Sequence, residues 1–275
     1  MKLKPKPVIN YCLPLRTIIL SIFTVILSLT TLTVINTNKT AYASDNNFAD
    51  GITVDSTGDG VDANVGNNIC DDGAGNCTLR AAIEESNATA GTQTINFNIS
   101  GTPDFTNGGH NGYSIKPVFG AGIPSVTDTV VINGYSQPGS LANTAVAPNP
   151  LNGRLLIEID GSLSGSDEGF NFTNNSHNSE IRGLIINNFD DNNAIIMLVD
   201  NITIQGNYIG TNFSGTTAKP NGIAINTDNL SPNNATDVLV GGLNPADRNL
   251  LSGNTASSTA TASYPGTNWV FQGNY

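Results

Sequence analysis

Residues 201–215 read NITIQGNYIGTNFSG, and a shortened copy of this stretch closes the chain. The segment IQGNY at residues 204–208 returns as FQGNY at residues 271–275, 67 positions later. We expect three units of roughly 22 residues in this interval, the length of one coil in a parallel β-helix. Similar apolar runs that end in Gly or Asn lie at residues 181–187, 238–242 and 250–254. A repeat of this length predicts a solenoid of stacked units.

The apolar residues of these runs alternate, which is typical of short strands. A short strand buries its apolar side only by stacking on a like strand of the next unit. We therefore expect Ile202 and Ile204 to point inward in one unit, and Val238 and Val240 in another.

Asn and Gly are placed where a coil must turn. Both tolerate positive φ more readily than other residues, so they suit the sharp bends between strands. Asn occupies 15 of the 74 positions in residues 181–254. At that density we expect Asn side chains of successive units to stack and to hydrogen bond one another.

The first 43 residues have the parts of a secretory signal peptide. A basic segment with Lys2, Lys4, Lys6 and Arg16 precedes an apolar run at residues 18–35, and Ala41-Tyr42-Ala43 follows. The apolar run is also long enough to span a bilayer, so an uncleaved anchor is the alternative. We expect cleavage after Ala43 and a secreted or cell-surface protein that meets the membrane only through this segment.

The mature chain is strongly acidic. Removal of residues 1–43 leaves 6 Lys and Arg against 22 Asp and Glu, a net charge of 6 − 22 = −16. Nucleic acids and anionic lipids select basic surfaces, so neither is expected as a partner. The partners that this composition allows are extracellular glycans and surface proteins.

Two cysteines remain in the mature chain, Cys70 and Cys77. In an exported protein, an even pair at short spacing is most simply a disulfide. Two free thiols are the alternative, and a pair without His or further Cys is a poor metal site.

Five carboxylates surround the cysteine pair in sequence: Asp55, Asp59, Asp62, Asp71 and Asp72. Ca²⁺ takes six to eight oxygen ligands, so this segment is a candidate calcium site, although its spacing is not that of an EF-hand loop. The alternative is a solvated, turn-rich entry segment. No motif indicates another cofactor.

Residues 78–90, TLRAAIEESNATA, predict the one convincing helix of the mature chain. Thr78 is a suitable N-cap, Leu79, Ala82 and Ile83 form one apolar stripe, and Gly91 ends the segment. Because a solenoid end exposes apolar core and open strand edges, we expect this helix to cover that end.

The segment CTLRAAI at residues 77–83 resembles the C-S/T-L-R-E-A-I signature of the CSLREA-domain family of bacterial secreted proteins, with Ala81 in place of the usual Glu. Residues 123–128 (IPSVTD), 132–139 (INGYSQPG) and 206–211 (GNYIGT) are similar to phrases that follow the signature. The resemblance implies a right-handed parallel β-helix behind an N-terminal cap, in large surface or secreted proteins, and it implies no catalytic set.

These observations together predict three segments. Residues 1–43 are the signal peptide, residues 44–94 form a cap with the disulfide loop and helix, and residues 95–275 form the coils. Because the chain stops in the middle of a unit, we expect a longer natural protein.

A polysaccharide-degrading enzyme, a lyase or a glycoside hydrolase, is the alternative function. Asp190-Asp191 and Asn226-Thr227-Asp228 are similar to two carboxylate motifs of polygalacturonase-like enzymes, and Arg182 and Arg248 have the type of a lyase base. Their order along the chain is reversed, however, and the Gly-His-Gly and Arg-x-Lys motifs of that family are missing. We therefore assign no catalytic residue.

Aromatic residues provide the remaining candidates for ligand binding. Trp269 and Tyr208 could stack on sugar rings at a coil face. Alternatively, Tyr208 and Tyr275, which are equivalent in the repeat, are ladder residues of the solenoid. The sequence thus favours a structural and adhesive surface protein that contacts glycans.

Overall fold

The computed structural model describes residues 51–190, 192–227, 235–256, 261–262 and 268–275. All of them belong to one compact unit, Phe48–Tyr275. The predicted signal peptide, residues 1–43, lies outside the described residues. None of the helices in the described part of the chain combines the length and apolar character that a membrane crossing requires.

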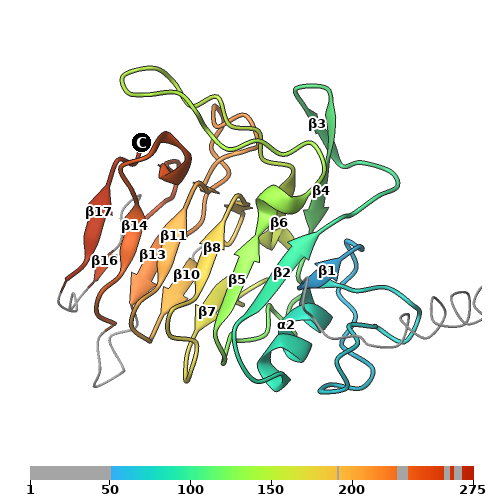
Figure 1. The fold of residues 1–275 in the computed structure, drawn as a ribbon. Coiled ribbons are helices and arrows are strands. Elements are labelled where there is room, and N and C mark those ends of the chain that lie inside the picture. The colour runs from blue at the N-terminus through green and yellow to red at the C-terminus, as the bar shows by residue number, and fades with distance from the viewer. Residues whose placement is uncertain (1–50, 191, 228–234, 257–260, 263–267) are drawn as a thin grey trace, which may run out of the picture. The chain divides into compact units, whose positions relative to one another are not determined.

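The strands form three sheets (Figure 1). The first sheet contains, in spatial order, β1 (Ile52–Val54), β2 (Gln93–Phe97), β5 (Val130–Asn133), β8 (Glu180–Arg182), β11 (Thr203–Gln205), β14 (Leu239–Gly241) and β17 (Val270–Gln272). The second contains β3 (Phe105–Asn107), β4 (His110–Ile115), β6 (Ile157–Asp160), β9 (Ile185–Asn187), β12 (Tyr208–Ile209) and β15 (Leu250–Leu251). The third contains β7 (Phe170–Phe172), β10 (Asn193–Met197), β13 (Ile223–Thr227) and β16 (Thr261–Ala262).

From β5 onward, the chain visits the three sheets in turn. We call one passage through the first, second and third sheets a circuit; β8, β9 and β10 form one, and β11, β12 and β13 form the next. Every pairing between named strands is parallel except the β3–β4 hairpin. The predicted all-β fold with parallel strands in stacked sheets is confirmed.

The length of a circuit differs from the prediction. Ile181 pairs with Ile204, Ile204 with Val240 and Val240 with Phe271, so successive circuits span 23, 36 and 31 residues. Two circuits, rather than three units of roughly 22, therefore separate the repeated segments 204–208 and 271–275. Loops at the corners lengthen the circuits, as at residues 211–218, where a bridge closes an inserted turn. Surface loops accept such insertions because they leave the strand pairing intact.

The inward-pointing rows of the sheets form the core. Ile202, Ile204, Val238 and Val240 are all almost completely buried, as alternation predicted. The third sheet adds large side chains such as Phe170 and Phe172 to the same core. Burial of such rows is the main stabilising contribution to a stack of short strands.

Asparagines connect successive circuits at the corner that follows the first sheet. Asn207 Nδ2 donates to Asn249 Oδ1 at 3.2 Å, and Asn249 Nδ2 donates to Asn274 Oδ1 at 3.0 Å. The same oxygens accept the backbone N–H groups of Asn207 and Asn249. At the next corner, Asn221 Nδ2 donates to Asn254 Oδ1 at 2.9 Å. The predicted ladders of stacked Asn side chains are confirmed.

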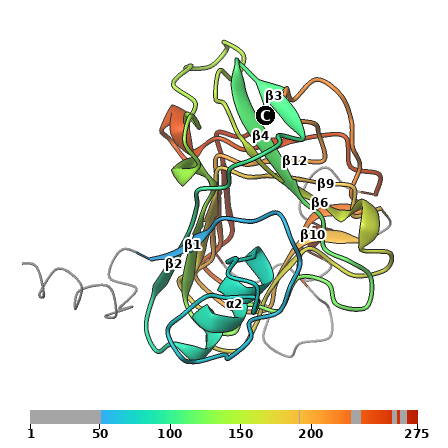
Figure 2. The same ribbon diagram turned by 90° about the vertical axis from the view of Figure 1, so that its right-hand side faces the viewer.

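Helix α2 (Leu79–Ala88) lies against β1 and β2 at the N-terminal end of the sheets (Figure 2). Thr78 caps it, because its side chain accepts a hydrogen bond from Ala81 N at 3.0 Å. Leu79 and Ile83 belong to the main core. Arg80, a buried residue of the helix, pairs with Asp59 at 2.9 Å. The predicted helix and its position over the core are confirmed.

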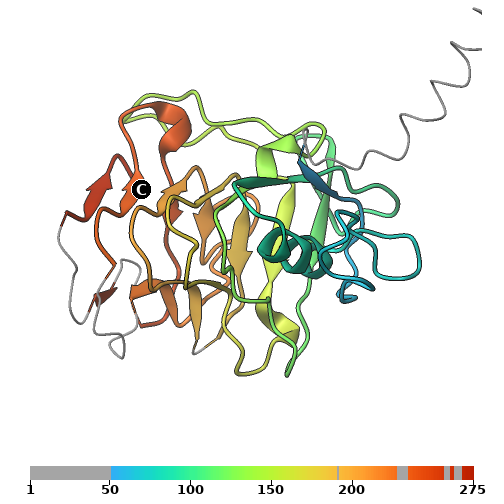
Figure 3. The ribbon, with the colours of Figure 1, turned by 60° about the horizontal axis from the view of Figure 1, so that its bottom comes forward.

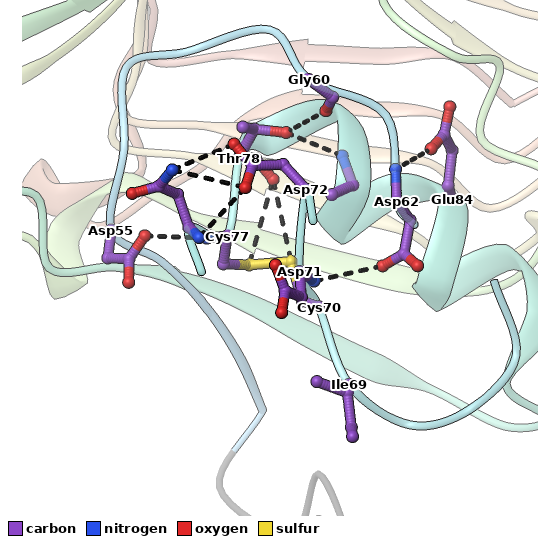
Figure 4. Close-up of a disulfide and its surroundings, with 12 residues drawn as sticks. Asp55, Gly60, Asp62, Ile69, Cys70, Asp71, Asp72, Cys77, Thr78 and Glu84 are labelled. Atoms are coloured by element: carbon purple, nitrogen blue, oxygen red, sulfur yellow. Dashed lines mark hydrogen bonds between the residues drawn. A yellow bond between two sulfur atoms is a disulfide. The ribbon is translucent and has the colours of Figure 1, made fainter. Parts of the chain in front are cut away.

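The disulfide between Cys70 and Cys77 is present, with an S–S distance of 1.98 Å (Figure 4). It closes the turn-rich loop that precedes α2. Glu85 of the helix, fully buried, accepts the N–H groups of Gly66 and Asn68 and so fixes the same loop. The loop is therefore closed by a covalent bond and tied to the helix by a buried carboxylate.

Residues 137–154 form a long excursion that we call the strap (Figure 3). Leu141 and Arg154 pair in antiparallel fashion at its base. Farther along, Asn143 Nδ2 donates to Pro245 O at 2.7 Å, and the Tyr275 hydroxyl donates to Asn149 O. The strap begins shortly after β5, but it contacts circuits that come much later in the sequence.

Candidate ligand-binding site

A second apolar cluster lies on the outer face of the second sheet, apart from the main core. Its buried members are Leu155, Ile185 and Tyr208. Tyr208 pairs with Ile185 on one side and with Leu250 on the other, so these residues form one outward row. Tyr135 and Leu250 pack against the cluster, as do side chains of the β3–β4 hairpin, the strap and the loop after β12: Phe105, Leu151 and Phe213. The cluster holds these three excursions on the sheet.

Tyr275 continues the row that contains Tyr208. Leu250 pairs with Tyr208, and Tyr275 hydrogen bonds to the strand of Leu250 through Asn249 O and Leu251 N, each at 2.9 Å. Tyr208 and Tyr275 therefore lie in one row across successive circuits. The guanidinium carbon of Arg248 lies 5.0 Å from the centroid of the Tyr275 ring, and Arg248 Nη1 donates to its hydroxyl at 2.9 Å.

A cavity of about 320 Å³, which we call the outer cavity, opens beside this row. Tyr208 and Leu250 line it from the sheet and Tyr275 from the following circuit. The strap and the loop after β12 supply the rest of its lining: Pro148, Pro150, Leu151, Ser214, Gly215 and Thr216. The site thus combines aromatic and proline surfaces with two hydroxyl side chains, Ser214 and Thr216, that are exposed.

The Tyr208 hydroxyl stays protonated over the physiological range. Burial raises its pKa above the ordinary value near 10. Burial also raises the pKa of Tyr135, which packs against the same cluster, and the nearby Tyr208 adds to this rise. Both residues are therefore neutral hydrogen-bond groups and are unsuited to act as bases at neutral pH.

Trp269 lies elsewhere. It precedes β17 in the first sheet, is partly buried, and donates from Nε1 to Ala235 O at 2.7 Å. Its ring centroid lies 5.9 Å from that of Phe271. Trp269 does not line the outer cavity, so the structure does not bring the two predicted ligand-binding residues, Tyr208 and Trp269, together.

Each of the five carboxylates of the predicted calcium site binds partners of its own within the protein. Asp55 accepts from Cys77 N at 2.8 Å, and Asp59 pairs with Arg80 and accepts from Val118 N at 3.1 Å. Asp62 accepts from Asn64 N at 2.8 Å. Each of these three carboxylates thus stabilises a different turn or segment of the cap.

Asp71 and Asp72 cap consecutive turns inside the disulfide loop (Figure 4). Asp71 accepts from Gly73 N at 2.7 Å and Asp72 from Ala74 N at 2.8 Å. The hydrogen bond from the Asn76 side chain, followed by backbone N–H groups, holds the pKa of Asp72 below its usual value. Within the described residues no group of three or more His, Cys, Asp or Glu side chains could hold a metal ion, so the structure does not gather the predicted calcium ligands.

The carboxylates of the enzyme alternative are partly outside the described residues, since Asp191 and Asp228 are not among them. Asp190 is exposed and lines a cavity of about 400 Å³ together with Asn188 and Pro220. No second carboxylate or base lines that cavity in the described part of the chain. Arg182 lies elsewhere and pairs with Glu180 at 3.1 Å.

A buried ionic network on β6 has no counterpart in the sequence-based predictions. Glu158 is 3% exposed and accepts from Asn187 Nδ2 and Lys219 Nζ, each at 2.8 Å. Asp160, two residues along, lies 3.6 Å from Lys116 Nζ. Strand alternation places both carboxylates outward, where the loop with Lys219 covers Glu158. The network fastens that loop to the sheet.

Comparison of the chain with protein-family models, curated proteins and solved structures gave no match. The function is therefore inferred from the positions of the chain's own residues. Sequence reasoning pointed to Tyr208 but missed the strap residues that complete its cavity. The Pro-rich composition of residues 146–150 was the available signal, and it does not say which circuit the strap reaches.

Proposed function

We propose that this chain is an exported, right-handed parallel β-helix that serves as a structural and adhesive element of a cell surface and binds glycans at the outer cavity. Parallel strands of one sheet, joined by connections through other layers, are right-handed in about 98% of known cases, which supports the handedness. The ordered visits to three sheets and the Asn ladders support the helical stack.

We further propose that the chain is related to the CSLREA-domain proteins. Each residue of the signature-like segment contributes to the cap. Cys77 forms the disulfide, Thr78 caps α2, and Arg80 reaches Asp59 together with the carbonyl oxygens of Ala121 and Gly122. Ala81 is fully buried. These contacts support a capping role for the segment and suggest no chemistry for it.

The outer cavity is the observation that carries the adhesive function. A sugar ring presents apolar C–H faces and a rim of hydroxyls, so it is recognised by aromatic or apolar surfaces with a few polar groups beside them. Tyr208, Leu250 and Tyr275 offer the first, and Ser214 and Thr216 the second. Because the strap is held at Pro245 and at Tyr275, the cavity is preformed.

The test is glycan binding by the whole chain with the cavity open or blocked. Thr216 lines the cavity and Thr217 does not, yet both are exposed residues of the same turn. Thr216→Trp should weaken binding about tenfold or more, a loss of roughly 1.4 kcal/mol, and Thr217→Trp should leave it unchanged. Glycan-array signals and affinities would be measured for both. Equal affinity of the two variants would contradict the assignment of the site.

A further inference from the structure

A second cavity lies over the outer face of the first sheet. Its volume is about 300 Å³, and we call it the inner cavity. Three outward side chains of adjacent strands line it: Asn133 of β5, Arg182 of β8 and Gln205 of β11. Tyr135 and the strap residue Ala142 add to the lining, as does Asp247 at the end of η4 (Pro245–Asp247).

Glycines create the space that the Tyr135 ring fills. A Cβ atom on Gly183 would lie 2.8 Å from that ring, and one on Gly206 would lie 2.3 Å from the hydroxyl oxygen. Both glycines have positive φ, +72° and +66°. Tyr135 therefore packs against the corner of two later circuits, where its hydroxyl donates to Gly206 O at 2.9 Å. The ring is a fixed wall of the cavity.

Two hydrogen bonds to backbone carbonyl groups hold η4, which carries Asp247. Asn143 Nδ2 of the strap donates to Pro245 O at 2.7 Å, and Asn143 is 4% exposed. Gly206 N donates to Asp247 O at 3.1 Å. Segments more than 100 residues apart in sequence are thereby joined around one cavity, which is what a preformed site requires.

The polar side chains of the inner cavity are positioned but not saturated. Arg182 donates from Nε to Asn133 Oδ1 at 3.0 Å and from Nη1 to Glu180 at 3.1 Å, which leaves Nη2 without a partner in the described chain. Asp247 uses Oδ2 to accept from Asn244 N and Nδ2, and Oδ1 has no described partner. Gln205 donates to Gly241 O, and its Oε1 is likewise unpaired among the described residues.

The charges favour a neutral ligand over an anion. Glu180 already pairs with Arg182, and Asp247 adds a second carboxylate to the cavity environment. A ligand carboxylate would meet this negative potential with only one unused guanidinium nitrogen. A vicinal pair of hydroxyls, in contrast, accepts from Arg182 and donates to Asp247 or Gln205 without bringing a charge.

We infer that the inner cavity is a binding subsite for one neutral monosaccharide unit, held between Arg182 and Asp247 beside Tyr135. This inference rests on the proposed glycan-binding function and adds a ligand class and a second location to it. Different residues of the strap line the two cavities. Ala142 lines the inner one, and Pro148, Pro150 and Leu151 line the outer one.

The test is calorimetric titration of the whole chain with D-glucose, D-galactose, D-mannose, D-glucuronate and alanine. Binding of at least one neutral hexose is expected, about tenfold weaker in Asp247→Asn and in Arg182→Gln, as for loss of a hydrogen bond to a charged group. Asp237→Asn is the matched control, since Asp237 is exposed and does not line the cavity. Thermal melting confirms that each variant folds; Asp247→Asn keeps an oxygen for the Asn244 cap.

Each of the other outcomes overturns the ligand class, the location, the whole inference, or the inference together with the proposed function. Binding of glucuronate or alanine in preference to every neutral hexose overturns the ligand class. Hexose binding that survives both Asp247→Asn and Arg182→Gln overturns the location. Glycan binding that is lost in Thr216→Trp but unaffected in Asp247→Asn overturns this inference and leaves the proposed function standing. Absence of any saccharide binding by the unmodified chain overturns both.

Discussion

The circuits from β8 onward and the earlier ones differ in the residues that satisfy the backbone hydrogen-bonding groups at their corners. After β11 and β14, the backbone groups at the turn are satisfied by a row of identical side chains, Asn207, Asn249 and Asn274. After β2, the Gln137 side chain takes over this role. Its Oε1 accepts from Ile99 N and its Nε2 donates to Ile99 O, both at 2.9 Å. Buried backbone groups need partners, and a periodic or a unique residue can supply them.

The two regions also differ in charge. The Asn ladders are neutral, whereas the outer face of the second sheet at β6 has buried Glu158 and Asp160 with lysine partners. The repeated amides thus belong to the later circuits and the disulfide to the earlier part of the chain, while the Glu158–Lys219 ion pair joins the two regions. The difference teaches that a regular stack can be built from both periodic and non-periodic contacts, of which only the first leave a pattern in the sequence.

The largest expected effect is at the centre of the ladder. Asn249→Ala would remove the partner of Asn207 N, of Ile204 O and of the Asn274 side chain, all at a fully buried position. We expect a loss of about 3 kcal/mol in the free energy of unfolding, since each buried unpaired group costs roughly 1–3 kcal/mol. Urea unfolding measures it, with the exposed Asn175→Ala as control. A loss no larger than that of the control would show that the ladder is not stabilising.

The non-periodic counterpart is Gln137→Ala. It leaves Ile99 N and Ile99 O without their amide partner, so a loss near 2 kcal/mol is expected in the same unfolding measurement. Hydrogen exchange should locate the loss at the turn after β2, while the amides of β11 and β14 keep their protection. Equal deprotection of the late circuits would mean that the two regions do not behave as separate stabilising systems.

Removal of the disulfide by Cys70→Ser with Cys77→Ser affects only the cap. A closed loop with a sequence separation of 7 predicts a loss of roughly 2 kcal/mol from chain entropy. The buried Glu85 still holds the loop on α2, so the helix should remain folded. Faster hydrogen exchange confined to residues 55–90 is the expected observation. Global loss of near-ultraviolet circular dichroism would show instead that the whole stack depends on the cap.

The smallest effect is expected from acid. Burial tends to raise the pKa of Asp160, but hydrogen bonds from Asn188 and Ser162 and the charge of Lys219 outweigh it, and the pKa lies below its usual value. This contribution is present above the unfolded pKa of about 3.9 and is lost as pH falls through the lower folded pKa. Asp160→Asn should therefore flatten the acid limb of stability against pH. An unchanged acid limb would exclude Asp160 as its source.

The features predicted correctly from the sequence are mainly the periodic ones. The repeat at residues 204–208 and 271–275, the buried alternation and the Asn ladders were readable because they are periodic. The number of circuits was wrong because corner loops of different length change the spacing without changing the pairing. The strands β10 and β13 of the third sheet and the hairpin β3–β4 were not predicted, since short strands owe their structure to neighbours rather than to local propensity.

For the candidate sites, too, features encoded by local sequence were predicted and contacts between distant residues were not. The Cys70–Cys77 disulfide and the position of Tyr208 in a repeated row followed from local sequence. The contacts of the strap with Pro245 and Tyr275 join residues more than 100 positions apart, and no local pattern encodes them. The predicted calcium ligands illustrate the reverse case, in which residues close in sequence bind separate partners.

One measurement tests the central claim most directly: incubation of the whole chain with a panel of glycans and polysaccharides, followed by assay of both bound sugar and newly formed chain ends. A glycan-binding β-helix should retain sugar, lose much of that retention in Thr216→Trp, and release no reducing or unsaturated ends. Release of such ends would establish the polysaccharide-degrading alternative and direct attention to Asp190, Asp191, Asp228 and Arg182. Failure to retain any glycan would contradict the adhesive function.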